Sequence, residues 1–420
     1  MNRKEKTILF IMPRLPFPAN SGRKTSLYHY CRILSCELGY RLVVAAFTEY
    51  GDNENLKPSF IDRLVILPKA SFIQRMKNIM INSLILRNQP MQVSLYWSKY
   101  AKKIVNELVK EENPSIVIGD MIRSTEYIKD INALRIADLD DRISLRYERQ
   151  LENDIENINP YGAFLKVIPR MIQKIMLFKP LKILVIKNEI ALLKRYELEI
   201  SRVCDKTIFV AQREANELNH ELGGDKAVAI PIGVDIDYFS YRETGSQGNN
   251  IGFLGAMSVA HNESAVRYFV SDIMPLILKS VPNAKFMIIG GGASDELKQM
   301  ENDYIKFTGC VDDVRDYLQE CKVFVCPMTF GSGIKTKNLE AMSLGLPVVT
   351  TSIGAENIDA KDGRDWLISD DSCKFAENVV TLLCDEDKRK QVGQNGSKYI
   401  QKKWTWNVTK QAFESLLGVE

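Results

Sequence analysis

The stretch FGSGIKTKNLE, residues 330–340, continues as AMSLGLPVVTT, residues 341–351, and determines how the second half of the chain folds. Gly331 and Gly333 allow backbone amides of the turn to approach a ligand closely. Lys335 and Lys337 follow at the expected start of a helix, where backbone amides and the helix dipole favour an anion. Glu340 comes about one turn later, placed to accept hydrogen bonds from hydroxyl groups. This layout predicts a ligand that joins a phosphate to a polyol.

The end of this stretch predicts the next two structural features. Gly345 ends the helix, and Pro347 prevents its continuation. The apolar run that follows predicts a buried strand.

Short apolar runs rich in β-branched residues alternate with helix-patterned segments along the whole chain. Alternation at this spacing indicates βαβ units and parallel sheets. About twelve strands are too many for one comfortable sheet, so two doubly wound α/β domains are expected. The predicted strands cover residues 7–12, 41–47, 64–67, 115–118, 134–139, 206–210, 227–235 (a strand running into a turn), 250–254, 285–289, 305–308, 323–326 and 347–350.

A polar, glycine-containing stretch without periodicity, residues 238–250, predicts a linker. The alternative is a surface loop within a single domain. The linker is favoured because the alternation of strands and helices restarts directly after it. The expected domains are residues 1–237, completed by a C-terminal helix over 401–420, and residues 238–400.

Ligands of open α/β sheets bind at the carboxyl ends of the strands, so the residues after each strand are the informative ones. In the second half, glycine follows five predicted strand ends, at residues 255, 290–292, 309, 331–333 and 354. In the first half, a loop with three prolines leads through Gly22 into a helix pattern. Five glycine turns at one edge predict a cleft floored by backbone, which suits a nucleotide diphosphate. The triplet at 290–292 also fits a tight turn without a ligand.

Composition is that of an ordinary globular protein, and the formal net charge of +3 does not argue for nucleic acid. The eight cysteines form no Cys-x-x-Cys pair, which predicts neither a zinc site nor a disulfide framework and favours a reducing cytoplasm. The apolar run at 7–13 is too short for a signal-peptide core. No window offers about 18 uncharged apolar residues, so no membrane-spanning helix is expected.

Two segments, residues 69–86 and 164–193, combine apolar residues with lysine and arginine and contain few acidic residues. Basic amphipathic helices lie on anionic membrane surfaces. The alternative is a helix packed on the core with a solvated basic face. The segments therefore predict a cytoplasmic protein that contacts the cytoplasmic face of the membrane. Pro180 is expected to break or kink the later segment.

Six short motifs follow the predicted strands or lead into helices. They are PIGVD (231–235), IGFLG (251–255) with Asn262, FTGCV (307–311), GSGIKTKNLE (331–340), LEAM (339–342) with Gly345 and Pro347, and WTW (404–406). These motifs resemble those of bacterial family-4 glycosyltransferases with the GT-B fold, over nearly the whole chain and most strongly over residues 250–360. The resemblance implies an α/β protein with two Rossmann-like doubly wound parallel-sheet domains facing a cleft, the first for the acceptor and the second for a nucleotide sugar. It implies a retaining, metal-independent hexosyltransferase without a cofactor, which moves a sugar from a nucleoside-diphosphate donor to a lipid-linked or surface-glycan acceptor.

The resemblance also implies roles for individual residues. Glu340 would bind the ribose of the donor, backbone amides of the 331–334 turn would bind its pyrophosphate, and Lys335 or Lys337 would neutralise the leaving diphosphate. Asp120 would contact the transferred sugar. The expected donor-binding residues are Gly22, Gly255, Val311, Gly331, Ser332, Gly333, Ile334, Lys337 and Glu340, and the expected catalytic residues are Asp120 and Lys335.

The chain departs from the family pattern where Ser332 replaces the first glutamate of a Glu-x7-Glu motif, and where an Arg and a Lys after the first donor-domain strand are missing. Two alternatives therefore stay open, a nucleotide-binding scaffold without activity and a nucleotide-sugar epimerase, although three histidines are few for an epimerase. Glu340 also fits an exposed glutamate favoured by the helix dipole, and Asp120 fits a helix cap. The run DLDD at 138–141 has the letters of a metal motif, but it follows a first-domain strand and no metal is expected there.

Overall fold

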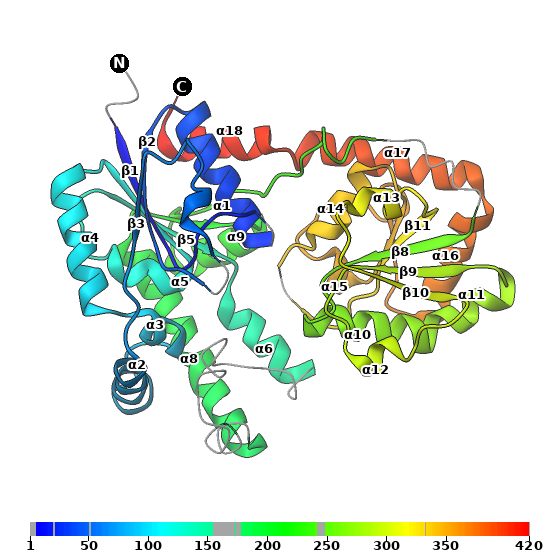
Figure 1. Cartoon of the computed structure of the whole chain (residues 1–420), viewed down its shortest axis with the longest axis horizontal. Helices are drawn as coiled ribbons and strands as arrows, with labels where there is room; N and C mark the ends of the chain where they lie inside the picture. The colour runs from blue at the N-terminus through cyan, green and yellow to red at the C-terminus, as the bar shows by residue number, and fades with distance from the viewer. Residues whose placement is uncertain are drawn as a thin grey trace. The chain divides into compact units, whose positions relative to one another are not determined.

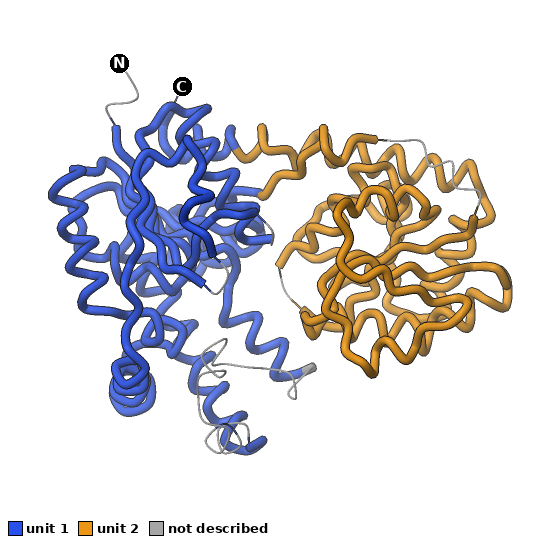
Figure 2. The backbone as a smooth tube through the Cα atoms, viewed as in Figure 1, with its two compact units in different colours: residues 1–231, 410–420 blue, residues 232–409 orange. Residues whose placement is uncertain are grey.

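The structure is a computed structural model of the chain that describes residues 6–19, 22–49, 52–153, 173, 178–241, 248–331 and 333–419. The chain divides into two compact units, residues 1–231 with 410–420 and residues 232–409 (Figure 2). Each unit contains one parallel sheet with helices packed against it (Figure 1). The prediction of two doubly wound α/β domains is confirmed.

The first unit is built on a seven-stranded sheet of order β3-β2-β1-β4-β5-β6-β7, with parallel pairing throughout. The strand order reverses between β1 and β4, which makes their carboxyl ends the place where such folds bind ligands. The strands are β1 (Thr7–Met12), β2 (Arg41–Ala46), β3 (Arg63–Ile66), β4 (Ile116–Asp120), β5 (Leu134–Asp140), β6 (Lys206–Phe209) and β7 (Ala227–Ala229). The helices are α1 (Gly22–Arg32), α2 (Phe72–Asn78), α3 (Met91–Tyr96), α4 (Lys99–Glu112), α5 (Met121–Ser124), α6 (Ile143–Asn153), α8 (Lys179–Val203) and α9 (Gln212–Leu222), with π-helical segments η2 (Ile33–Glu37) and η4 (Ile79–Ile85) and short 3-10 turns at Glu54–Leu56 and Thr125–Tyr127.

The second unit repeats this plan with a six-stranded parallel sheet of order β10-β9-β8-β11-β12-β13. Here the order reverses between β8 and β11. The strands are β8 (Asn250–Leu254), β9 (Lys285–Ile289), β10 (Ile305–Gly309), β11 (Val323–Cys326), β12 (Val348–Thr350) and β13 (Leu367–Ile368). The helices are α10 (Ala260–Tyr268), α11 (Met274–Ser280), α12 (Asp295–Lys298), α13 (Val314–Leu318), α14 (Thr336–Ser343), α15 (Ser352–Ala355), α16 (Ser372–Cys384), α17 (Glu386–Lys403) and α18 (Trp406–Leu417), with a π-helical segment η7 (Phe269–Ile273) after α10.

The central strands are mostly apolar because the sheets are covered on both faces. All six residues of β1 are buried. Leu9 and Ile11 pack in one large core cluster with Val105 and Tyr127, while Ile8 and Phe10, which alternate with them along the strand, are buried as well. Such continuous burial is typical of parallel sheets. It explains why apolar runs, rather than alternating patterns, predict the strands of this chain.

The twelve predicted strands are present, and most of their ends agree within two residues. The exception is β7, which ends at Ala229, so that the residues after it form the predicted turn. The strand β13 was missed because it has only two residues, too few to form a pattern.

The chain passes between the two units twice, once near residue 231 and once within α18. In the second unit, Val234 pairs with Thr405, and its amide donates to the Trp404 carbonyl at 2.7 Å. These contacts explain why the division at residues 231 and 232 comes before the predicted boundary at 238. At the other passage, Phe413 packs edge to face on Tyr30 of α1, 5.0 Å between ring centroids, so α18 completes the first unit. Within the predicted linker, residues 242–247 lie outside the described residues.

Helix α17 approaches the end of α14 closely through a glycine. A Cβ atom built on Gly393 would lie 2.1 Å from the carbonyl oxygen of Gly345, which is backbone and cannot swing aside. Gly345 itself has φ +84°, and its amide donates to the Met342 carbonyl at 3.0 Å, which ends α14 as predicted. The packing of α17 on this turn therefore fixes the helix that begins at Thr336.

We expect Gly393→Ala to destabilise the second unit by about 1–3 kcal/mol, because overpacking outweighs the gain in helix propensity. Thermal unfolding should show a melting temperature lower by roughly 2–4 °C for each kcal/mol. Gly248→Ala in the same unit is the matched control, since its Cβ would lie 3.5 Å from the nearest atom, and it should melt like the unmodified protein. A Gly393→Ala protein as stable as the parent would contradict the close contact.

Candidate functional site

The loops after β8 and β11 meet at the carboxyl edge of the second sheet. The strands are hydrogen-bonded neighbours, and the strand order reverses between them. The loop after β11 leads through Gly331 (φ +134°) and Gly333 (φ +69°) into α14, a backbone path that favours glycine. Lys335 occupies the N-cap position of α14, and its side chain makes no capping hydrogen bond. The predicted turn and helix start are therefore both present.

Gly255, directly after β8, faces the first turn of α14. A Cβ atom at Gly255 would lie 2.8 Å from both the Lys337 Nζ and the Asn262 Nδ2 atoms. The absence of a side chain at residue 255 is thus what leaves room for the lysine ammonium. Gly255 and Lys337, which the sequence predicted separately, lie together.

The ammonium group of Lys337 is held by neutral partners rather than by a carboxylate. Its Nζ donates to the Asn262 Oδ1 at 2.6 Å and lies 4.3 Å from the centroid of the Phe253 ring. Burial, with a contribution from nearby Lys335, lowers the pKa of Lys337 to about 8. Lys335 is buried too, but its Nζ donates to the Gly333 carbonyl at 2.9 Å and so braces the turn. Lys337 therefore supplies positive charge that is only partly compensated.

Glu340 lies on α14 one turn after Lys337 and is half-buried. Burial raises the pKa of its carboxyl group to about 7, although Lys337 acts in the opposite direction. Among the described residues, the Glu340 carboxylate makes no hydrogen bond or ion pair. The Glu340 carboxylate is therefore partly removed from water, but it lacks the hydrogen-bond partners that buried carboxylates usually have.

The glycines at 290–292 are explained by packing. A Cβ atom on Gly290 would lie 2.2 Å from the Gly255 carbonyl oxygen, and one on Gly291 would lie 2.2 Å from the Cys310 Sγ atom. The tight-turn interpretation is therefore favoured over a ligand role. Val311 follows β10, the edge strand of the sheet, and is half-buried.

Comparison with known proteins identifies this unit. Residues 248–385 match the family model described as Glycosyl transferases group 1. Residues 248–385 are thus similar to a group 1 glycosyltransferase domain. The matched residues include the 331–340 turn and helix, Gly255, Asn262 and Val311.

Two curated relatives match about half of this chain. An uncharacterized 44.6 kDa protein in the cps region of Klebsiella pneumoniae is 25% identical over 238 residues, 54% of this chain and 59% of that protein. Phosphatidyl-myo-inositol mannosyltransferase of Mycobacterium tuberculosis is 26% identical over 200 residues, 44% of this chain and 52% of that protein. The chain thus spans between half and three fifths of the length of these curated relatives.

The likeness to solved structures covers both units. HepE of Anabaena, solved in complex with UDP and glucose, superposes with a TM-score of 0.64 at 14% identity, covering 99% of this chain and 100% of that chain. At this identity the likeness shows the fold alone, and the predicted GT-B fold is confirmed.

The structure brings most of the predicted residues of the second unit into one group. Around the turn after β11 it brings together Gly255, Gly331, Gly333, Lys335 and Lys337, with the half-buried Ile334 in the same turn and Glu340 on the next turn of helix. Ser332 lies outside the described residues. His261 belongs beside this group, because its ring lies 6.4 Å from that of Phe330 in an edge-to-face contact. The motif at 251–255 included Asn262 without assigning it a role, and the structure shows that it accepts a hydrogen bond from Lys337.

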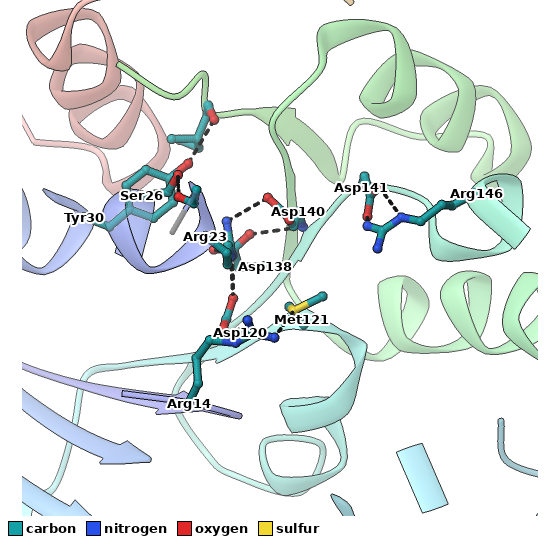
Figure 3. Close-up of polar contacts among 12 residues, drawn as sticks. Arg14, Arg23, Ser26, Tyr30, Asp120, Met121, Asp138, Asp140, Asp141 and Arg146 are labelled. Atoms are coloured by element: carbon teal, nitrogen blue, oxygen red, sulfur yellow. Dashed lines mark hydrogen bonds and ion pairs between the residues drawn. The ribbon is translucent and has the colours of Figure 1, made fainter. Parts of the chain in front are cut away.

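At the carboxyl edge of the first sheet, one arginine joins three aspartates (Figure 3). The guanidinium of Arg23, at the start of α1, donates to Asp120 at 3.0 Å from Nε, to Asp138 at 2.7 Å and to Asp140 at 2.9 Å. We call these four residues the Arg23 cluster. Asp120 ends β4, and Asp138 and Asp140 lie at the end of β5, so the cluster lies beside the point where the strand order reverses.

The backbone is strained where it enters this cluster. Met121 (φ +53°) and Asp140 (φ +68°) adopt left-handed conformations that residues other than glycine rarely take. Strain of this kind persists only where surrounding contacts enforce it, and it concentrates at functional positions.

Three carboxylates around one guanidinium leave negative charge in excess. Burial, opposed by Arg23 and reinforced by the carboxylates of Asp120 and Asp140, raises the pKa of Asp138 to about 7. Burial also raises the pKa of Asp140. Asp120 is fully buried, and its Oδ2 atom has no hydrogen-bond partner among the described residues. The cluster can therefore accept hydrogen bonds or a proton.

Asp120 occupies the N-cap position of α5, but its side chain makes no capping hydrogen bond and instead accepts from Arg23. Gly22, the predicted contact from this unit, is the first residue of α1, and a Cβ atom there would meet nothing within 4 Å. No sequence pattern singles out Arg23, because its three partners follow about 100 residues later. The DLDD run contributes two of those partners, Asp138 and Asp140. In the part of the chain that the structure describes, no group of three or more His, Cys, Asp or Glu side chains is arranged to hold a metal ion.

We expect Asp138→Asn to raise stability at about pH 8 by roughly 1 kcal/mol, and to lose this advantage near pH 5. The folded-state pKa of Asp138 lies above its ordinary value, so the stabilisation that protonation provides is present at low pH and is lost as the pH rises through about 7. The asparagine side chain carries no charge at any pH, so the variant does not undergo this loss of stability. Urea unfolding across the pH range measures the effect.

Asp205→Asn in the same unit is the control with the opposite sign. Asp205 is exposed, and hydrogen bonds from Arg135 outweigh the opposing effect of burial and lower its pKa, so its loss should destabilise the protein at about pH 8. An Asp138→Asn protein less stable than the parent at that pH would show that the ion pair with Arg23 outweighs the excess of negative charge.

Proposed function

We propose that the chain is a retaining glycosyltransferase that moves a hexose from a nucleoside-diphosphate donor to a lipid-linked or surface-glycan acceptor, without a metal ion. The observation that carries the proposal is the arrangement around Gly255. A glycine turn leads into the helix start, where a lysine ammonium has an amide oxygen and an aromatic ring as its partners. A carboxylate to which the described residues offer no hydrogen bond lies one turn further along the same helix.

Each part of this arrangement fits one part of the donor. The diphosphate is an anion, and Lys337 together with the first-turn amides of α14 provides positive potential for it. Glu340 accepts hydrogen bonds from the ribose hydroxyls, which replaces the solvation that burial removes. Val311 lies in the loop proposed to contact the nucleobase.

The charge of the leaving group dominates the energetics of the reaction. Breaking the bond between the anomeric carbon and the phosphate oxygen releases a diphosphate whose added charge must be stabilised. Lys335 and Lys337 do this electrostatically, a contribution of several kcal/mol for well-placed donors in a site from which water is excluded. A divalent cation is not required for this role. In the first unit, Asp120 is the proposed contact for a hydroxyl of the transferred sugar.

Relatives and structural neighbours support the substrate class. One relative has a name that contains both mannosyltransferase and a lipid, phosphatidyl-myo-inositol. One structural neighbour was solved in complex with UDP and glucose. The position of another relative in a cps region favours a cell-envelope glycan. We infer by analogy that this protein works in the cytoplasm on envelope polysaccharide.

Glu340→Ala should weaken binding of the donor nucleotide by roughly ten- to a hundredfold, the usual effect of removing a charged hydrogen-bond partner. Isothermal titration calorimetry with UDP and with GDP measures this, after a thermal-shift panel of nucleotide sugars has selected the donor. Glu386→Ala, an exposed glutamate at the start of α17, is the control and should bind normally. Unchanged affinity of Glu340→Ala would exclude the ribose role, and a parent protein that binds no nucleotide sugar would favour the inactive scaffold.

The affinity for the nucleoside diphosphate should fall as the pH rises from about 7 to about 9. The pKa of Lys337 is about 8, so the ammonium that attracts the phosphates loses its proton over this range. Lys337→Met should bind more weakly at about pH 7, by roughly tenfold, and should show a flatter pH dependence. Lys322→Met, which removes a lysine bonded to Asn249 elsewhere in the unit, should keep the parent's slope. An affinity that stays constant or rises with pH would contradict the role of Lys337.

A further inference from the structure

Helix α2 and the π-helical segment η4 bury two polar side chains and expose most of their apolar ones. Asn78 and Ser83 are buried, whereas Ile73 is 78% exposed and Ile85 is 68% exposed. A helix on the surface of a globular protein normally presents the opposite arrangement. The reversal implies that something other than water covers the outer side.

Hydrogen bonds to the inward polar groups fix this orientation. The Asn78 Nδ2 atom donates to the carbonyl oxygens of Ser94 and Trp97, both at 3.1 Å, and the Ser83 Oγ lies 3.0 Å from the Ser94 Oγ. Rotating the helix to bury its isoleucines would leave these buried polar groups unpaired, which is costly. The apolar side therefore stays outward.

The first turns of α8 extend this surface. The Asn188 Nδ2 atom donates to the Ser83 carbonyl at 3.2 Å, and Val185 packs on the small core formed by Ile79, Met91 and Leu95. In Figure 1, α2 and the start of α8 lie at the same end of the first unit. Sixteen large apolar side chains of the described residues are exposed, and ten of them belong to these two segments, so the exposure is concentrated. We call these ten the apolar face: Phe72, Ile73, Met80, Ile81, Leu84, Ile85, Leu86, Phe178, Leu181 and Leu184.

The exposed charged side chains that border the apolar face on these segments are all positive. The sequence from residue 63 to residue 106 contains no aspartate or glutamate. Exposed Lys77 and Arg87 border α2 and η4, and exposed Lys179 and Lys187 border the start of α8. An anionic lipid surface complements both the apolar side chains and this charge. A second copy of the chain would instead bring like charges together.

We propose that the apolar face inserts into the interface of an anionic lipid bilayer, with the bordering lysines and arginines on the lipid headgroups. No helix in the described ranges is long and apolar enough to span a membrane. The contact is therefore peripheral. The inference rests on the proposed function for its purpose, since a lipid-linked acceptor lies in such a bilayer. It concerns residues that are separate from the nucleotide site, so vesicle binding and nucleotide binding can fail independently.

Co-sedimentation of the full chain with phosphatidylglycerol–phosphatidylcholine vesicles tests the proposal. The protein should sediment with these vesicles, bind pure phosphatidylcholine vesicles much less, and lose affinity with added salt. The preference should be about fivefold for each basic residue near the surface. Ile85→Asp and Leu184→Asp should each weaken binding by roughly tenfold or more, because each removes an inserted apolar side chain and adds a repelled charge.

Leu56→Asp is the matched control, because Leu56 is a 53% exposed leucine outside the apolar face. This variant should bind vesicles like the parent, and all three variants should keep the parent's affinity for the nucleotide in calorimetry. Failure of the parent to bind anionic vesicles, or parent-like binding by Ile85→Asp and Leu184→Asp, would overturn the proposal. Size-exclusion chromatography gives the remaining outcome. A parent dimer that Ile85→Asp converts to a monomer, without vesicle binding by either, would assign the face to a second copy.

Discussion

Burial of both faces of each parallel sheet is the constraint on which the rest of this structure depends. A strand such as β1, with all six residues buried, offers no surface for polar chemistry along its length. Polar groups are therefore confined to the loops at the strand ends. In both units they gather where the strand order reverses, beside β4 in the first and between β8 and β11 in the second. The same topology thus produces two candidate sites in one chain.

The carboxyl edges of the two sheets accommodate buried charge in opposite ways. In the second unit, Lys337 is accommodated by an amide oxygen and an aromatic ring, which leaves positive potential for an anionic ligand. In the first unit, the single guanidinium of Arg23 serves three carboxylates, which leaves the Asp120 Oδ2 atom unpaired. One edge suits phosphates and the other suits groups that donate hydrogen bonds or carry a proton. This contrast agrees with the proposed division between a donor and an acceptor.

The sequence predicted features that depend on neighbours along the chain. Apolar runs revealed the strands, and the Gly331–Glu340 stretch revealed the turn, the helix start and its end at Gly345. Features that depend on distant residues were not predicted. Arg23 meets Asp120 and Asp138 only because parallel strands align their ends, and Asn262 became a partner of Lys337 only through the fold. The basic segment at 69–86 was noticed as amphipathic, but which side faces outward follows from the hydrogen bonds of Asn78 and Ser83. Of the segment at 164–193, the structure describes residue 173 and residues 178–193, and Pro180 lies in the first turn of α8.

The edge-to-face contact between Tyr30 and Phe413 has a consequence for synthesis. The first unit includes residues 410–420, so it is discontinuous along the chain. Domains of nascent chains generally fold as they leave the ribosome, in order from the N-terminus. Here Tyr30 must wait for Phe413 until the whole second unit has been translated. The second unit can thus reach its final packing first, and the half of the protein that is made earliest is the last to be finished.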